Sequence, residues 1–113
     1  MSLRQPTAIR GNLMQPRAIG LLQLDITGPN RHRDEQVIGT LAHQRGYEFV
    51  GILTIRSDTY MPTTLVVQTA CKAGAIAILT PHFGHFGGHA RAIALACDLV
   101  TPDGTLPRSI RNR

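Results

Sequence analysis

The chain has 113 residues, of which 42% are hydrophobic and 17% are charged, so it can form one domain with a buried core. This composition excludes wholesale disorder, and no apolar run approaches the roughly 18 residues that a membrane span requires. The N-terminal segment is interrupted by Pro6 and Pro16 and lacks the hydrophobic region of a signal peptide. We therefore expect a cytoplasmic protein with no membrane partner.

The net charge of +5 is concentrated at the two ends of the chain. Residues 1–17 and 108–113 each contain three arginines and no acidic residue, whereas residues 18–107 contain six basic and seven acidic residues. We expect a nearly neutral domain over 18–107, flanked by flexible basic tails. The arginine tails could contact nucleic-acid phosphates weakly and without sequence preference. The favoured alternative is that they are solvated ends that keep a small protein in solution.

Apolar periodicity divides the domain into alternating strands and helices. The mostly apolar run Ala18–Ile26 predicts a first strand, which a turn cluster of Thr, Gly, Pro and Asn closes. Apolar residues at helical spacing then predict a helix over 31–45. Asn30 is its candidate N-cap and Gly46 its natural terminator.

The same alternation continues through the second half of the domain. The predicted elements are a strand over Phe49–Ile55, a helix over Thr63–Ala73 ending at Gly74, a strand over Ala75–Leu79, a short helix from about His89 to Cys97 and a last strand over Leu99–Thr101. The two cysteines, Cys71 and Cys97, lie in the helical patterns. We expect both to be reduced packing residues rather than a disulfide.

This order of elements predicts an α/β fold, a three-layer α/β/α sandwich with a mostly parallel four-stranded sheet over residues 18–101. Parallel sheets of this kind place their sites beyond the carboxyl ends of the strands. Three loops are expected at that edge, over residues 25–30, 56–62 and 80–88. The candidate pocket residues at these strand ends are Gln23, Asp25, Arg56, Asp58, His82 and His85.

The third loop carries the histidines His82, His85 and His89 at spacings of three and four residues. These could converge on a metal only if the segment were helical, and no carboxylate or thiol is nearby as a fourth ligand. The pair Gly87-Gly88 before a helix could cradle a phosphate, although no Walker lysine or full dinucleotide fingerprint accompanies it. Solvent-facing histidines that cap the following helix are the simpler interpretation, so we predict no metal and no cofactor.

The other two loops carry polar residues with several possible roles. Asp25 could serve as a base or a metal ligand, but a strand-end aspartate equally often accepts hydrogen bonds from loop N–H groups. No second carboxylate, Ser–His pair or Cys–His pair can be assigned to Asp25. In the second loop, Arg56, Ser57 and Asp58 could form a local ion pair or a polar site, and a hydrogen-bonded turn is the favoured interpretation.

The body of the chain resembles the catalytic domain of the resolvase/invertase serine recombinases over residues 18–101. The first strand of that family has a pattern of the type I-G-Y-x-R-V-S-T, which contains an arginine and the nucleophilic serine. When the pattern is aligned on Ile19-Gly20, Gln23 occupies the arginine position and Asp25 the serine position. The segment Gly46-Tyr47-Glu48 also matches the spacing of the family.

The later motifs of that family are incomplete in this chain. The segment Met61-Pro62-Thr63-Thr64-Leu65 keeps the proline and leucine of R-P-x-L but lacks the arginine. The family's D-R-L-S/G-R motif falls on Pro81–His85 or on Gly84–Gly88, and neither stretch contains an arginine or an aspartate. Serine recombination needs an alkoxide nucleophile and guanidinium groups that face the phosphodiester. The family's long oligomerisation helix and helix-turn-helix domain are also missing, so the resemblance implies a degenerate relative that is inactive in recombination.

Three functional hypotheses follow. The first is a resolvase-like domain without recombinase chemistry that acts as a binding or regulatory module, with a homo-oligomer as its possible assembly. The second is a small enzyme that reuses the strand-end pocket, with Asp25 and either His82 or His85 as acid and base. The third is a DNA-associated accessory protein related to site-specific recombinases. The charge distribution favours the first over the third, and the missing partner for a catalytic base favours it over the second.

Overall fold

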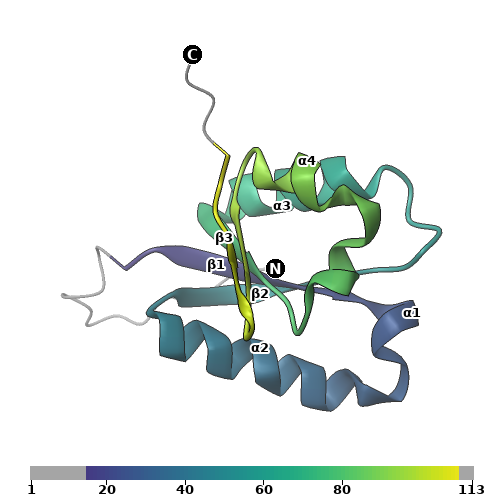
Figure 1. Cartoon of the computed structure of the whole chain (residues 1–113), viewed down its shortest axis with the longest axis horizontal. Coiled ribbons are helices and arrows are strands. Elements are labelled where there is room, and N and C mark those ends of the chain that lie inside the picture. The colour runs from purple at the N-terminus through teal and green to yellow at the C-terminus, as the bar shows by residue number, and fades with distance from the viewer. Residues whose placement is uncertain (1–14, 110–113) are drawn as a thin grey trace.

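The computed structural model describes residues 15–109 and shows an α/β fold with a five-stranded sheet (Figure 1). The strands are ordered β2-β1-β3-β4-β5 across the sheet. In chain order the elements are β1 (Arg17–Gln23), α1 (Leu24–Thr27), the 3₁₀ helix η2 (Gly28–Asn30), α2 (Arg31–Arg45), β2 (Glu48–Ile55), α3 (Pro62–Ala73), β3 (Ala75–Leu79), the 3₁₀ segment η3 (Phe83–His89), α4 (Ala90–Ala94), β4 (Asp98–Thr101) and β5 (Gly104–Leu106).

The mostly parallel sheet is confirmed, but the predicted number of four strands is wrong. Strands β1 to β4 are parallel, and β5 pairs with β4 in the antiparallel direction. The chain reverses after Thr101, whose hydroxyl accepts hydrogen bonds from the backbone N–H groups of Asp103 and Gly104. This turn aligns Gly104–Leu106 with β4 and adds the fifth strand.

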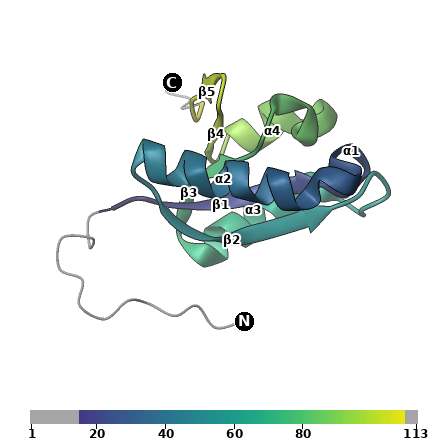
Figure 2. The same ribbon diagram turned by 90° about the horizontal axis from the view of Figure 1, so that it is seen from below.

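Helices cover both faces of the sheet. Helix α2 lies on one face, whereas α3 and α4 lie on the other (Figures 1 and 2). Each face has its own apolar cluster. The α2 side buries Ala18, Leu22, Ile38, Leu41, Ala42, Ala77, Leu79 and Val100, and the α3–α4 side buries Ile19, Leu21, Ile55, Val66, Ala70, Ile78, Phe86, Ile93, Ala94, Cys97 and Leu99. Because the sheet is covered on both sides, its central strands can be almost wholly apolar.

Helix α2 has its predicted range, whereas strand β1 begins one residue earlier and ends three residues earlier than predicted. Strand β1 ends at Gln23 instead of Ile26, because the Gln23 side chain accepts a hydrogen bond from the Asp25 amide at 2.6 Å and starts a helical turn. Asn30 makes no side-chain capping bond, since it belongs to η2, which leads directly into α2. The predicted terminator Gly46 is confirmed, with a left-handed φ of 77°.

The segment between β3 and β4 departs furthest from prediction. The expected loop over 80–88 contains η3, and the expected helix over 89–97 is reduced to α4. Cys97 is buried as expected, whereas Cys71 is exposed on α3, and both are free thiols. The packing role predicted for Cys71 is therefore wrong, because that residue lies on the outer face of its helix.

Arg17 belongs to the sheet and not to the basic N-terminal tail. Its Nε lies 3.4 Å from the Glu48 carboxylate, and its Nη1 donates a hydrogen bond to the Ala73 carbonyl. At the other end, the Arg108 amide donates to the Asp98 carboxylate. The rest of both predicted tails, residues 1–14 and 110–113, lies outside the described residues. Within the described range 15–109, no helix is long and apolar enough to cross a membrane.

Candidate functional site

The sheet changes its winding direction at β1. The connection from β1 through α2 leads to β2 on one side, and the connection from β2 through α3 leads to β3 on the other side of β1. The chain segment after β1 leads to α2 and the segment after β3 leads to α4, and these two helices lie on opposite faces of the sheet, so the segments diverge at its carboxyl edge (Figures 1 and 2). Ligands of open parallel sheets bind at such a switch point.

A cavity of about 220 Å³ lies at this edge. Its polar lining consists of Gln23, Arg56, Ser57, His85 and His89, and its apolar walls include Ile26, Ile55, Pro62 and Phe86. These residues come from all three of the predicted loops and from the strand ends that precede them. The sequence indicated that a site would lie at the carboxyl edge of the sheet. It did not indicate the apolar lining residues, because each of them also fits an ordinary core or surface position.

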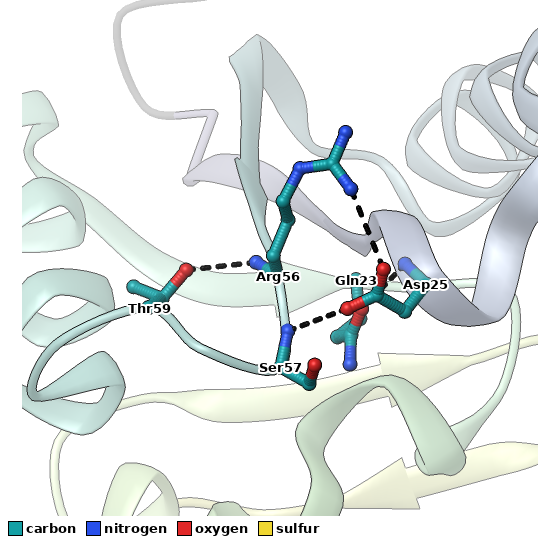
Figure 3. Close-up of polar contacts among 5 residues, drawn as sticks. All are labelled: Gln23, Asp25, Arg56, Ser57 and Thr59. Atoms are coloured by element: carbon teal, nitrogen blue, oxygen red, sulfur yellow. Dashed lines mark hydrogen bonds and ion pairs between the residues drawn. The ribbon is translucent and has the colours of Figure 1, made fainter.

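Asp25 is held by the second loop (Figure 3). Its Oδ2 accepts a hydrogen bond from the Ser57 amide at 2.8 Å, and its Oδ1 lies 3.4 Å from the Arg56 Nη1. The pKa of the Asp25 carboxyl is lowered, chiefly by the backbone hydrogen bond from Ser57 and to a smaller extent by the Arg56 charge. Asp25 is therefore an ionised anchor between the loops that follow β1 and β2.

The second loop forms a hydrogen-bonded turn between Arg56 and Thr59. The Arg56 amide donates to the Thr59 hydroxyl at 2.8 Å, and the Thr59 amide donates back to the Arg56 carbonyl at 3.0 Å (Figure 3). Arg56 forms its ion pair with Asp25 of the first loop. The sequence pattern had suggested a local ion pair within Arg56, Ser57 and Asp58. Asp58 is exposed and takes part in no hydrogen bond or ion pair with the residues from 15 to 109.

His85 is a buried residue, contrary to the prediction that the loop histidines face solvent. Only 1% of it is exposed, and its Nδ1 accepts a hydrogen bond from the Gln23 amide at 3.0 Å. This bond places the proton of the neutral ring on Nε2, which has no hydrogen-bond partner in the described part of the chain. Burial lowers the pKa of His85, the neighbouring His82 lowers it further, and Asp34 opposes the shift.

His82 has a different role from the one predicted. Its Nδ1 accepts a hydrogen bond from the Gly84 amide at 3.2 Å, so it caps η3 and not the later helix. The rings of His82 and His85 are 4.5 Å apart. Among residues 15–109, no group of three or more His, Cys, Asp or Glu side chains is placed to hold a metal ion. The described histidines therefore offer no metal-binding arrangement.

Among residues 15–109, the candidate acid and base residues are not paired with one another. No hydrogen bond joins Asp25 to His82 or His85 in the described chain, and each of the three has its own backbone partner. Met61 precedes the cavity residue Pro62 with a left-handed φ of 48°, a strained conformation for a side chain of this size.

No protein-family model, curated protein or solved structure matches this chain.

Proposed function

We propose that this chain is a resolvase-like domain without recombinase chemistry that binds a small ligand in the cavity at the carboxyl edge of its sheet. The observation that carries the proposal is the cavity of about 220 Å³ at the switch point, where apolar walls surround a few convergent polar groups. Those polar groups come from the end of β1, the loop after β2 and η3, which are tied together by the hydrogen bonds of Asp25 and His85. A preformed pocket of this kind is suited to recognition.

Asp25 and His85, two of the candidate acid and base residues, are engaged in structural hydrogen bonds. Both carboxylate oxygens of Asp25 have partners in the second loop, and the Nδ1 of His85 already accepts the Gln23 amide. A general base needs a free lone pair directed at the substrate, whereas Asp25 is not among the residues that line the cavity and the Nδ1 of His85 is occupied. The residues that the enzyme hypothesis requires therefore hold the loops in place, which favours a binding module over an acid–base catalyst.

A ligand panel followed by thermal unfolding and by amide NMR tests the proposal. We expect at least one class among phosphates, nucleotides, divalent cations and small carboxylates to raise the melting temperature and to shift the amides of Gln23, Ser57 and His85. Ser57→Tyr should fill the cavity and abolish the response. Asp58→Tyr places the same side chain outside the lining and should preserve the response. If no compound in the panel shifts an amide of the cavity, the binding proposal is wrong.

A second prediction concerns the absence of recombinase chemistry. Duplex DNA that carries recombination sites should be neither cleaved nor covalently linked to the full chain, because Gln23 and Asp25 occupy the positions of the arginine and the nucleophilic serine in the resemblance. Asp25→Ser should not create activity, since within residues 15–109 Arg56 alone pairs with residue 25 and no arginine cluster faces the new hydroxyl. Asp58→Ser is the matched control. A protein–DNA adduct that survives denaturation with either protein would contradict the prediction.

A further inference from the structure

Strand β2 is an open edge of the sheet (Figure 2), because within the described chain it pairs with β1 alone. It has eight residues and is the longest strand that the structure describes, whereas β5 at the opposite edge has three. Residues 49–55 contain no charged side chain and no proline, two features that protect many edge strands from pairing with another chain. Among residues 15–109, no backbone hydrogen bond reaches 49–55 from a segment other than β1.

The register between β1 and β2 identifies the backbone groups that face outward. The Glu48 amide donates to the Pro16 carbonyl at 2.7 Å, so the even-numbered residues of β1 direct their backbone groups at β2. Beyond a bulge at Val50, these even-numbered residues are paired with Ile52 and Thr54. In a parallel ladder, a residue that bonds across the pair is matched with a residue whose own groups point away. The N–H and C=O groups of Ile52 and Thr54 therefore point to the open side.

The side chains along this edge are apolar and incompletely covered. Phe49 is 37% exposed, and Val50, Ile52 and Leu53 are partly buried. Val50 and Leu53 pack against the core cluster on the α3 side and line an apolar hollow of about 180 Å³ between β2 and α3. A further strand at this edge would cover apolar surface as well as satisfy the free backbone groups.

We propose that β2 pairs with β2 of a second copy of this chain, in the antiparallel direction about a two-fold axis normal to the sheet. Ile52 of each copy then lies opposite Thr54 of the other, and each such pair exchanges both of its N–H···O bonds. Leu53 lies at the axis, opposite the Leu53 of the second copy. The bulge at Val50 ends the pairing at Gly51. The two five-stranded sheets become one continuous sheet.

A second copy is the occupant that this geometry selects. Ile52 and Thr54 are separated by Leu53 alone, so beyond the bulge the row of free groups is unchanged when it is turned through half a circle, as an isologous interface requires. The same rotation keeps each helix on its own face of the joined sheet. The two Leu53 side chains therefore meet on the α3 face, beside the hollows of both copies. The interface does not depend on a ligand in the cavity, so the two proposals fail separately.

Sedimentation of the full chain measures the association. We expect a reversible change from monomer to dimer between about 1 µM and about 1 mM, the affinity range of a small interface. Leu53→Lys should weaken the dimer at least about tenfold, because it places two like charges opposite each other at the axis. Leu95→Lys makes the same change at a leucine that is 60% exposed outside β2 and should leave the association unchanged. A chain that stays monomeric at about 1 mM, or equal weakening by the two variants, overturns the proposal.

Cysteine cross-linking tests the register and does not require a lysine to be tolerated at residue 53. The background is Cys71→Ser, because Cys71 is an exposed free thiol and Cys97 is buried. Oxidised glutathione supplies the oxidant. Leu53→Cys should give a disulfide-linked dimer, because a directly opposite pair without backbone hydrogen bonds has its Cα atoms about 4.5 Å apart, within disulfide range. Thr54→Cys faces Ile52 of the second copy and should stay unlinked. Linkage through neither cysteine, or equal linkage through both, overturns the proposal.

Discussion

Replacing Gly20 with alanine should lower the free energy of unfolding by about 1–3 kcal/mol, the usual cost of overpacking a core. An added Cβ would lie 2.8 Å from the Cγ2 of Ile38 and 3.1 Å from the Cγ1 of Ile52. Ile38 is fully buried on α2, and its branched side chain has few alternative rotamers with which to move away. The close packing of α2 on β1 therefore depends on the absence of a side chain at residue 20.

Gly39→Ala is the matched control, because it makes the same chemical change on the helix that packs against Gly20. Its added Cβ would meet no atom within 4 Å, and the residue lies inside α2. Alanine is favoured over glycine in a helix by about 0.5–1 kcal/mol, so this variant should be more stable than the parent chain. Urea unfolding of the three proteins measures both effects. Equal destabilisation by the two variants would show that the contact with Ile38 is not the cause.

Acidification should destabilise the fold through His85. In the folded chain the neutral ring accepts the Gln23 N–H, and protonation would bury a charge and place a second donor opposite that amide. The folded-state pKa is therefore lowered, by burial first and by His82 second, against an opposing effect of Asp34. The stabilisation is fully present above the ordinary histidine pKa of 6.5 and is lost as pH falls below that value toward the folded pKa.

Urea unfolding between pH 7.5 and pH 5.5 measures this dependence. One such histidine contributes a slope of at most about 1.4 kcal/mol per pH unit in the window where only the unfolded chain binds the proton. His85→Gln should remove that contribution, since the glutamine carbonyl can accept the Gln23 N–H without titrating in this range. His43→Gln, at an exposed position of α2, should retain it. An unaltered slope in His85→Gln would show that the buried ring does not govern the response to acid.

The candidate site was only partly accessible to sequence reasoning. The polar residues at the strand ends could be named in advance, and Gln23, Arg56 and His85 do line one cavity. Their partners could not be foreseen. The hydrogen bond between His85 and the Gln23 amide joins residues 62 positions apart, and the ion pair of Asp25 with Arg56 spans 31 positions. No local pattern specifies which histidine of a glycine-rich loop is buried, so His85 and His82 looked equivalent.

The sequence alone determined the elements whose cause is local. Strand β3 occupies its predicted range Ala75–Leu79, and α2 and α3 stop at Gly46 and Gly74, because apolar periodicity and the left-handed freedom of glycine act within a few residues. Tertiary structure alone decided the burial of His85, because its hydrogen-bond partner Gln23 lies 62 positions away and the two residues meet only when the sheet has assembled. The early end of β1 and the turn into β5 have local causes, the Gln23 side chain and the Thr101 hydroxyl, which a reading based on apolar periodicity does not detect.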